Sequence, residues 1–149
     1  MKENKGIALI SLVIIIVALG IAIFAGVKYM QDFQNKQKNE DIKADMLAIQ
    51  SVITNIKNKH TVDETNNALI GTKIDLETND TEYKVNEELK EELLKAEEPD
   101  LYVLNETELQ ESGVQGVDIN AEEFYIVDYN SEEVFYSLGV EGNYKLSDM

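Results

Sequence analysis

Cysteine is absent from the 149 residues of the sequence, and histidine and proline each occur once. Without cysteine the chain can form neither a disulfide nor a thiolate metal site, and it has no thiol nucleophile. The single histidine, His60, makes a poor zinc site. It stands with Lys57 and Lys59 near the expected end of a helix, where positive charge is favourable. We therefore expect a helix-terminal role for His60, with no metal site and no cofactor.

Catalytic patterns are missing as well. No serine, histidine and aspartate stand in a plausible catalytic context, and no glycine-rich loop of the kind that cradles phosphate is present. Paired acids such as Glu87-Glu88 and Glu91-Glu92 are frequent. They fall in expected exposed helices or turns, and neighbouring residues on a helix do not face the same way. We therefore expect no enzymatic activity and no small-molecule substrate.

Positive charge is scarce in the second part of the chain. Residues 61–149 hold five lysines and 24 acids, whereas residues 28–60 hold six lysines and four acids. A surface so acidic repels phosphate backbones, so we expect no nucleic-acid contact from residues 61–149. Asp75, Glu77 and Asp80 offer the oxygen ligands that calcium prefers, which leaves calcium as an alternative there. Because no EF-hand spacing is present, the sequence predicts no metal site.

One long uncharged segment contrasts with this acidic composition. Gly6–Val27 reads GIALISLVIIIVALGIAIFAGV and contains no charged residue. A helix of about 20 apolar residues spans roughly 30 Å of hydrocarbon, so we expect a transmembrane helix. Short basic ends stay in the cytoplasm, which predicts a cytoplasmic N-terminus and an extracellular C-terminal region. A secretory signal cut after Ala18-Leu19-Gly20 and an uncleaved signal anchor are the alternatives.

Small residues recur along this segment at spacings that let helices approach closely. They are Ser11, Ala18, Ala22 and Gly26. We interpret them as an assembly face that packs on copies of the same helix. The alternative is that small residues are simply common in such helices.

The junction at the start of the segment resembles a known signal. Lys5-Gly6-Ile7-Ala8-Leu9-Ile10-Ser11-Leu12 is similar to the prepilin signal of type IV pilins and type II secretion pseudopilins, in its Gram-positive variant. The resemblance implies that a prepilin peptidase in the membrane cuts between Gly6 and Ile7 and methylates the new amine of Ile7. Family members usually carry glutamate where this chain has Ser11. A serine offers only a neutral hydrogen bond, worth about 0.5–1.5 kcal/mol, which points to a minor or tip subunit.

The residues that follow predict that the helix continues. Residues 28–60 contain neither proline nor glycine, and five apolar residues recur at spacings of four, three, four and three, the period of a helix face. This helix core face consists of Ile42, Met46, Ile49, Ile53 and Ile56. We expect one helix from about Ile7 to Lys59, with the rest of the chain packed on this face.

Shorter elements are expected in the remaining residues. We predict a short strand at 73–76, helices at 86–96 and 106–111, a strand at 101–104, and a hairpin of 124–129 with 133–138. Asn105 and Glu108 have the spacing of a capping box. The sequence YIVDYNSEEVFYSLGV resembles the C-terminal strand pair of the same pilin-like group. The tyrosines of this region could pack the sheet or form a binding surface.

Together these observations predict an α+β fold. A long N-terminal helix, with a membrane half and an amphipathic half, packs against a small C-terminal antiparallel sheet, as the pilin-like resemblance implies. We expect a leader at 1–6, a transmembrane assembly helix at 7–27, its extracellular continuation at 28–60 and an acidic globular region at 61–149.

The expected function is that of a pilin-like or pseudopilin structural subunit of a type IV filament or a type II secretion-like machine. Its expected partners are the membrane, the prepilin peptidase and other pilin-like subunits. Its expected location is the cell membrane, crossed once, or a surface filament. The alternative is a single-pass, membrane-anchored extracellular binding module that does not polymerise.

Overall fold

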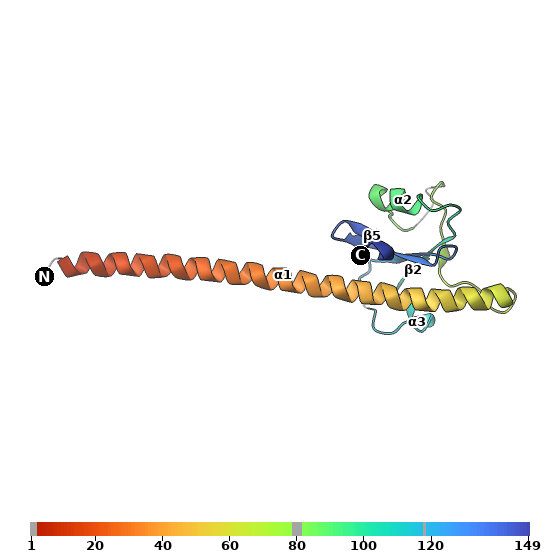
Figure 1. Cartoon of the computed structure of the whole chain (residues 1–149), viewed down its shortest axis with the longest axis horizontal. Coiled ribbons are helices and arrows are strands. Elements are labelled where there is room, and N and C mark those ends of the chain that lie inside the picture. Colours follow the sequence, from red (N-terminus) through yellow and green to blue (C-terminus); the bar gives the residue numbers. More distant parts are fainter. Residues whose placement is uncertain (1–2, 79–81, 118) are drawn as a thin grey trace. The chain divides into compact units, whose positions relative to one another are not determined.

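The structure is a computed structural model that describes residues 3–78, 82–117 and 119–149, without the side chains of residues 3–12 and 20–25. Its elements follow the chain in the order shown in Figure 1: α1 (Glu3–Val62), β1 (Thr72–Lys73), α2 (Glu87–Leu93), β2 (Leu101–Leu104), α3 (Glu106–Glu111), β3 (Tyr125–Asp128), β4 (Glu133–Val140), β5 (Asn143–Lys145) and the 3-10 helix η1 (Leu146–Asp148). The chain divides into two compact units, Met1–Glu40 and Asp41–Met149. We call the second the head unit.

The long N-terminal helix is present and begins and ends slightly beyond its expected bounds. α1 has 60 residues, with Lys59 and His60 in its last turn. Residues 28–62 contain neither proline nor glycine, the two residues least compatible with a helix interior. After Val62, the side-chain carboxylate of Asp63 accepts a hydrogen bond from the backbone amide of Thr65 at 3.1 Å. Such a side-chain hydrogen bond is typical of a turn, and the chain leaves the helix axis here.

The expected membrane span is corrected by the structure. Among the described residues, no helix is both long enough and apolar enough to cross a membrane. This finding contradicts the transmembrane interpretation of Gly6–Val27 and the single-pass localisation at the cell membrane. A helix that crosses the hydrocarbon needs about 20 consecutive apolar residues, and the described residues contain no helix that meets this requirement. The segment's side chains at 6–12 and 20–25 lie outside the described residues.

The five strands of the head unit form one antiparallel sheet in the order β1-β2-β3-β4-β5. The α+β class and the small C-terminal antiparallel sheet are therefore confirmed. The predicted hairpin is β3 with β4, in which Tyr125 lies opposite Tyr136 and Asp128 opposite Glu133. β1 is shorter than predicted, and β5 was not predicted.

Both short helices begin at the predicted caps. The side chain of Asn86 accepts a hydrogen bond from the amide of Leu89 at 2.7 Å, and Asn105 and Glu108 form a reciprocal capping box at the start of α3. α2 ends at Leu93, three residues before its predicted end. Leu94, which follows the last residue of α2 and lies within the predicted helix 86–96, is 55% exposed.

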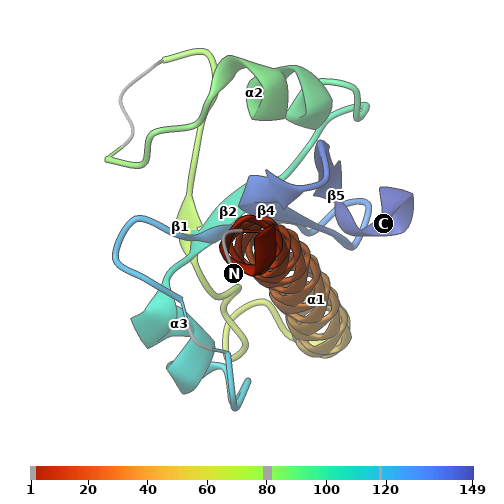
Figure 2. The same cartoon turned by 90° about the vertical axis from the view of Figure 1, so that its left-hand side faces the viewer.

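The sheet is buried on both faces, whereas the sequence predicted only the packing of the long helix against it. All four residues of β3 are buried. Alternate residues such as Tyr125 and Val127 pack with the core face of α1, while Ile126 packs with Leu89 and Leu93 of α2. Figure 2 shows α1 and α2 on opposite sides of the sheet. The head unit is thus a three-layer arrangement of α1, sheet and α2.

Candidate assembly surface

The described residues of α1 before Asp41 expose many large apolar side chains. Those in the run 13–19 are between 51% and 62% exposed, and Tyr29 and Met30 are 77% and 63% exposed. We call this set the candidate assembly surface: Val13, Ile14, Ile15, Ile16, Val17, Leu19, Val27, Tyr29, Met30 and Phe33. Monomeric proteins seldom expose apolar patches of this extent, and such patches mark sites of interaction.

The residues predicted to carry processing and assembly lie along the same helix. The backbone is helical at Gly6, Ile7, Ser11 and Ala22. The side chains of Ile7, Ser11 and Ala22 lie outside the described part of the structure. Ala18 and Gly26 are described and exposed.

A Cβ atom added at Gly26 would meet no atom within 4 Å. The helix surface is therefore open at this position.

The helix core face lies in the head unit. Met46 and Ile49 are fully buried, Ile53 is 1% exposed and Ile42 is 8% exposed. Ile56 is partly buried and packs against the same cluster. Removing each of these side chains from water contributes about 1.5–3 kcal/mol. This burial holds residues 42–56 of α1 on the sheet.

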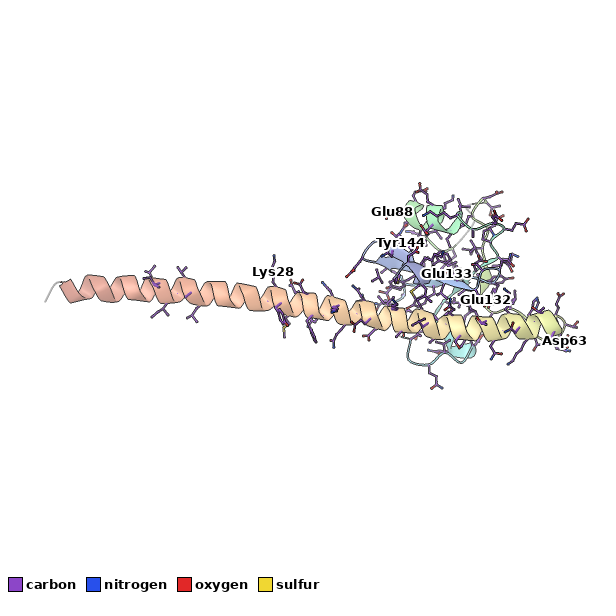
Figure 3. The ribbon with its side chains drawn as sticks, in the orientation of Figure 1. Lys28, Asp63, Glu88, Glu132, Glu133 and Tyr144 are labelled. Atoms are coloured by element: carbon purple, nitrogen blue, oxygen red, sulfur yellow. The ribbon has the colours of Figure 1, made fainter. Side chains whose placement is uncertain are left out.

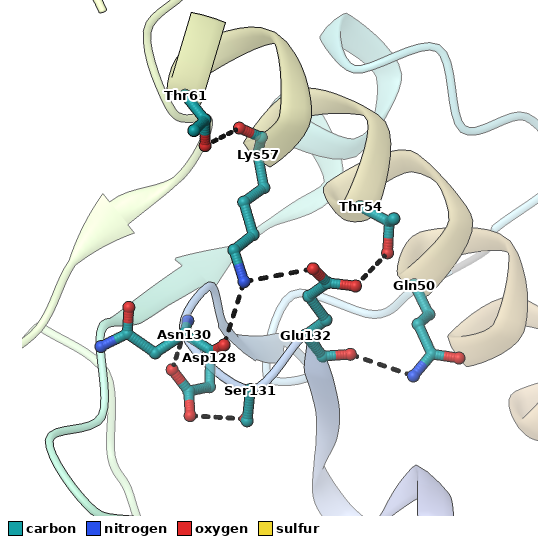
Figure 4. A network of polar contacts seen from close by, with 8 residues as sticks. All are labelled: Gln50, Thr54, Lys57, Thr61, Asp128, Asn130, Ser131 and Glu132. Atoms are coloured by element: carbon teal, nitrogen blue, oxygen red, sulfur yellow. Dashed lines mark hydrogen bonds and ion pairs between the residues drawn. The ribbon is translucent and has the colours of Figure 1, made fainter.

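Polar contacts fix the turn between β3 and β4 on α1. Figure 4 shows Glu132 at the centre of this network. Its carboxylate pairs with the Lys57 ammonium at 3.1 Å and accepts a hydrogen bond from the Thr54 hydroxyl at 3.0 Å. Its backbone carbonyl accepts from the Gln50 amide at 3.0 Å. Lys57 also donates to the carbonyl of Asn130 at 3.0 Å.

The backbone of Glu132 has an unusual conformation at this turn. Its φ is 58°, in the left-handed region that disfavours residues with a side chain. The hydrogen bonds from Lys57 and Thr54 hold the pKa of the Glu132 carboxyl below its ordinary value. The strain at the turn is thus accompanied by ionic and hydrogen-bonded contacts with α1.

Asp128 is the buried acid at the end of β3. It is 1% exposed, and its carboxylate accepts hydrogen bonds from the amides of Asp100 and Asn130 at 2.9 and 3.0 Å. The Ser131 hydroxyl donates to its other oxygen at 2.6 Å. A buried carboxylate is tolerated when its oxygens are satisfied in this way. Asp128 therefore ties the hairpin turn to the segment before β2.

The tyrosines of the sheet are packed within the head unit. Tyr125, Tyr129 and Tyr136 are each at most 2% exposed, and burial raises the pKa of Tyr129 and Tyr136 to about 12. The Tyr129 hydroxyl donates to the carbonyl of Ile70 at 2.9 Å. The hydroxyl of the half-buried Tyr144 donates a hydrogen bond to the carboxylate of Glu88 at 3.0 Å. Both residues are labelled in Figure 3. Sheet packing, rather than a binding surface, accounts for the three buried tyrosines.

Among the residues considered for metal binding, those that the structure describes are not gathered into one site. His60 Nδ1 lies 2.6 Å from the carbonyl of Asn67, so the histidine joins the end of α1 to the following loop. Asp80 lies outside the described residues, and Asp75 caps its own turn by accepting from the amide of Glu77 at 2.9 Å. Within the described ranges, no group of three or more His, Cys, Asp or Glu residues could hold a metal ion.

No protein-family model, curated protein or solved structure matches the chain. The pilin-like resemblance of residues 5–12 and of the C-terminal strand pair therefore stays a prediction.

Two features of the site were not foreseen from the sequence. Glu132 falls between the predicted strands 124–129 and 133–138, where a polar connection is expected, but its neighbours in the sequence do not indicate a contact with α1. The anchoring of Glu132 on Gln50, Thr54 and Lys57 depends on pairing between residues about 80 positions apart, for which the sequence carries no local signal.

Proposed function

We propose that the chain is a pilin-like or pseudopilin structural subunit, which assembles with copies of itself or with related subunits through α1. The observation that carries this proposal is the candidate assembly surface, a run of apolar side chains left exposed on α1. Helices pack by interlocking such side chains. Burying a large apolar side chain in a neighbouring subunit gains about 1.5–3 kcal/mol.

The prepilin-like junction supports the same proposal from the sequence. Cleavage between Gly6 and Ile7 by a prepilin peptidase removes the charged leader at 1–6 and leaves the apolar helix on the mature subunit. Methylation of the Ile7 amine then completes processing. The peptidase and other pilin-like subunits are the partners in this proposal.

Ser11 defines the kind of subunit. A neutral hydrogen bond from serine stabilises a subunit contact less than a charged one, so a subunit with Ser11 suits a position that makes fewer contacts. We assign the chain to the minor or tip subunits of a type IV filament or a type II secretion-like machine. Its role is structural rather than catalytic, and its acidic surface does not favour nucleic acid.

Intact-mass analysis of the protein purified from cells that contain a prepilin peptidase tests the processing step. We expect the mass to correspond to loss of Met1–Gly6 and gain of one methyl group on Ile7. Gly6→Val should leave the chain uncut, and Gly26→Ala, a matched glycine change further along α1, should be cut as usual. An intact N-terminus in the unmodified protein, or one that begins at Ile21, would overturn the proposal.

Quantitative mass spectrometry of isolated filaments tests the minor or tip assignment. We expect this chain at a low ratio to a major subunit. Replacing Ser11→Glu should raise its ratio, because the acid restores a charged contact. A ratio equal to that of the major subunit would contradict the minor assignment, and absence from filaments would contradict assembly.

A further inference from the structure

A mixed face of lysine and aromatic side chains lies on α1 outside the apolar run 13–19. Tyr29 and Phe33 are 77% and 56% exposed. Tyr29, Phe33 and Lys36 are spaced by four and three residues, so they lie on one side of the helix. Lys28 adjoins Tyr29 and projects from the helix, as Figure 3 shows. We call these four residues the lysine–aromatic face.

In the described structure the lysines of this face form no ion pair within 4 Å, unlike several lysines of the head unit. Within the described residues, Lys28 and Lys36 take part in none of the ion pairs within 4 Å. In the head unit, by contrast, Lys57 pairs with Glu132 and Lys73 pairs with Asp100. Two lysines that form no ion pair within 4 Å in the described structure thus stand at either end of two exposed aromatic rings, with the exposed Asp32 one turn from each lysine.

The outer side of α2 has the complementary composition. Glu87, Glu91 and Leu94 are spaced by four and three residues and are all exposed, Leu94 by 55%. The inner side of α2 is held on the sheet by Leu89 and Leu93, which are fully buried. In the described residues, Glu87 and Glu91 make no ion pair within 4 Å. We call Glu87, Glu91 and Leu94 the glutamate–leucine face.

We propose that the lysine–aromatic face of one copy packs on the glutamate–leucine face of a second copy. This inference rests on the proposed function, because it names the surface by which one subunit meets the next. In an antiparallel alignment of the two faces, Tyr29 lies opposite Leu94 and Lys36 lies opposite Glu87. The apolar pair excludes water, while the opposite charges set orientation and specificity.

Cysteine cross-linking tests the contact without background, because the chain has no cysteine. Tyr29→Cys and Leu94→Cys, the pair that the alignment sets opposite each other, are placed on separate full-length copies that carry tags of different length, and the two copies are assembled together and oxidised. We expect a disulfide-linked species of mixed tag. Leu138→Cys, at a side chain that is 58% exposed on β4, replaces Leu94→Cys in the control and should give little mixed species.

Charge reversal tests the electrostatic part of the contact. Lys36→Glu should lower the yield of mixed species about fivefold, because it sets a negative charge against the acidic face. Glu87→Lys on the second copy should restore the yield. Lys38→Glu makes the same charge change two residues further along, on another side of the helix, and should leave the yield unchanged.

The outcomes separate this inference from the proposed function. Filaments that form without the mixed species overturn the inference and leave the proposed function standing. A mixed species without filaments, together with its loss in Lys36→Glu, supports the contact but overturns filament assembly. Equal yields for Lys36→Glu and Lys38→Glu overturn the electrostatic pairing. Absence of both filaments and mixed species overturns both proposals.

Discussion

Two parts of one helix differ in what they bury. Met30 is 63% exposed and Met46 is fully buried, and Ile16 is 60% exposed while Ile53 is 1% exposed. The same residue types therefore have opposite environments before and after Asp41. The difference shows that apolar character alone does not decide burial within this chain. Burial also requires a face with the right spacing and a sheet to receive it.

The charged residues of the helix differ in the same way. Lys57 is held by Glu132 and by the Asn130 carbonyl, whereas Lys28 makes no ion pair in the described structure. α1 after Asp41 packs within the head unit, whereas the proposed function gives assembly to α1 before Asp41. Four predictions test this division of roles.

The largest effect is expected from a matched pair of isoleucines. Ile53→Ala should lower the free energy of unfolding of the head unit by about 2–5 kcal/mol, because it leaves a cavity in a packed core. Ile16→Ala should change it by no more than about 0.5 kcal/mol, as is usual for exposed positions. Urea unfolding followed by the near-ultraviolet circular dichroism of the tyrosines measures both. Equal losses of unfolding free energy in the two variants would contradict the difference between the two parts of α1.

Alanine substitutions at two glycines should change stability in opposite directions. Gly71 has a φ of 110°, and a Cβ atom there would lie 2.8 Å from the Val103 carbonyl oxygen. Gly71→Ala should therefore destabilise the head unit by about 1–3 kcal/mol. Gly26→Ala, in open space on α1, should favour the helix by about 0.5–1 kcal/mol.

Thermal unfolding of the head unit and helix content by far-ultraviolet circular dichroism measure the two effects. Gly113 also has a positive φ, but a Cβ atom added there would meet nothing within 4 Å. Gly113→Ala is thus the control for backbone strain without a steric clash. A loss in Gly113→Ala as large as in Gly71→Ala would show that the close approach to Val103 is unimportant.

Alanine substitutions at two lysines should differ by a smaller amount in their effect on the stability of the head unit. Lys57→Ala should lower the stability of the head unit by up to about 1 kcal/mol, the usual range for a partly exposed ion pair. Lys28→Ala should leave it unchanged. A double-mutant cycle of Lys57→Ala with Glu132→Ala measures the pairwise contribution. A coupling free energy of zero would show that Lys57 does not anchor the turn.

The smallest effect is expected from acid. Because the pKa of Glu132 is lower in the folded chain than its ordinary value of 4.5, the unfolded chain binds the proton more readily. The stabilisation is therefore fully present above about pH 4.5 and is lost as the pH falls through the folded-state pKa. Glu132→Gln should flatten the stability profile in this window. An identical profile in Glu132→Gln would assign the acid sensitivity to other carboxyls.

Much of the local structure could be predicted because it depends on neighbouring residues. The caps at Asn86 and Asn105 follow from side chains that reach amides three residues away, and the β3–β4 hairpin follows from two β-rich segments joined by a short turn. The end of α2 was predicted less well. Pro99 marks the latest point at which that helix can stop, whereas the structure ends it at Leu93, whose side chain is buried among residues of the sheet.

The candidate site could be predicted only in part. The spacing of Ile42 to Ile56 predicts a face to be covered, and the structure buries four of its five residues. The segment Gly6–Val27 was interpreted as a membrane span from hydropathy alone, and the described residues contain no helix able to cross a membrane. Hydropathy indicates that burial of these apolar side chains is favourable, but it does not identify the surface or solvent in which they are buried.

The long helix, its core face, the helix caps and the terminal hairpin follow from the amino-acid sequence, because each depends on periodicity or on residues a few positions apart. Only the tertiary structure decided that α2 covers the second face of the sheet and that Glu132 meets Thr54 and Lys57. These contacts join residues far apart in the chain. Such pairings depend on how the layers stack, and no local pattern encodes that stacking.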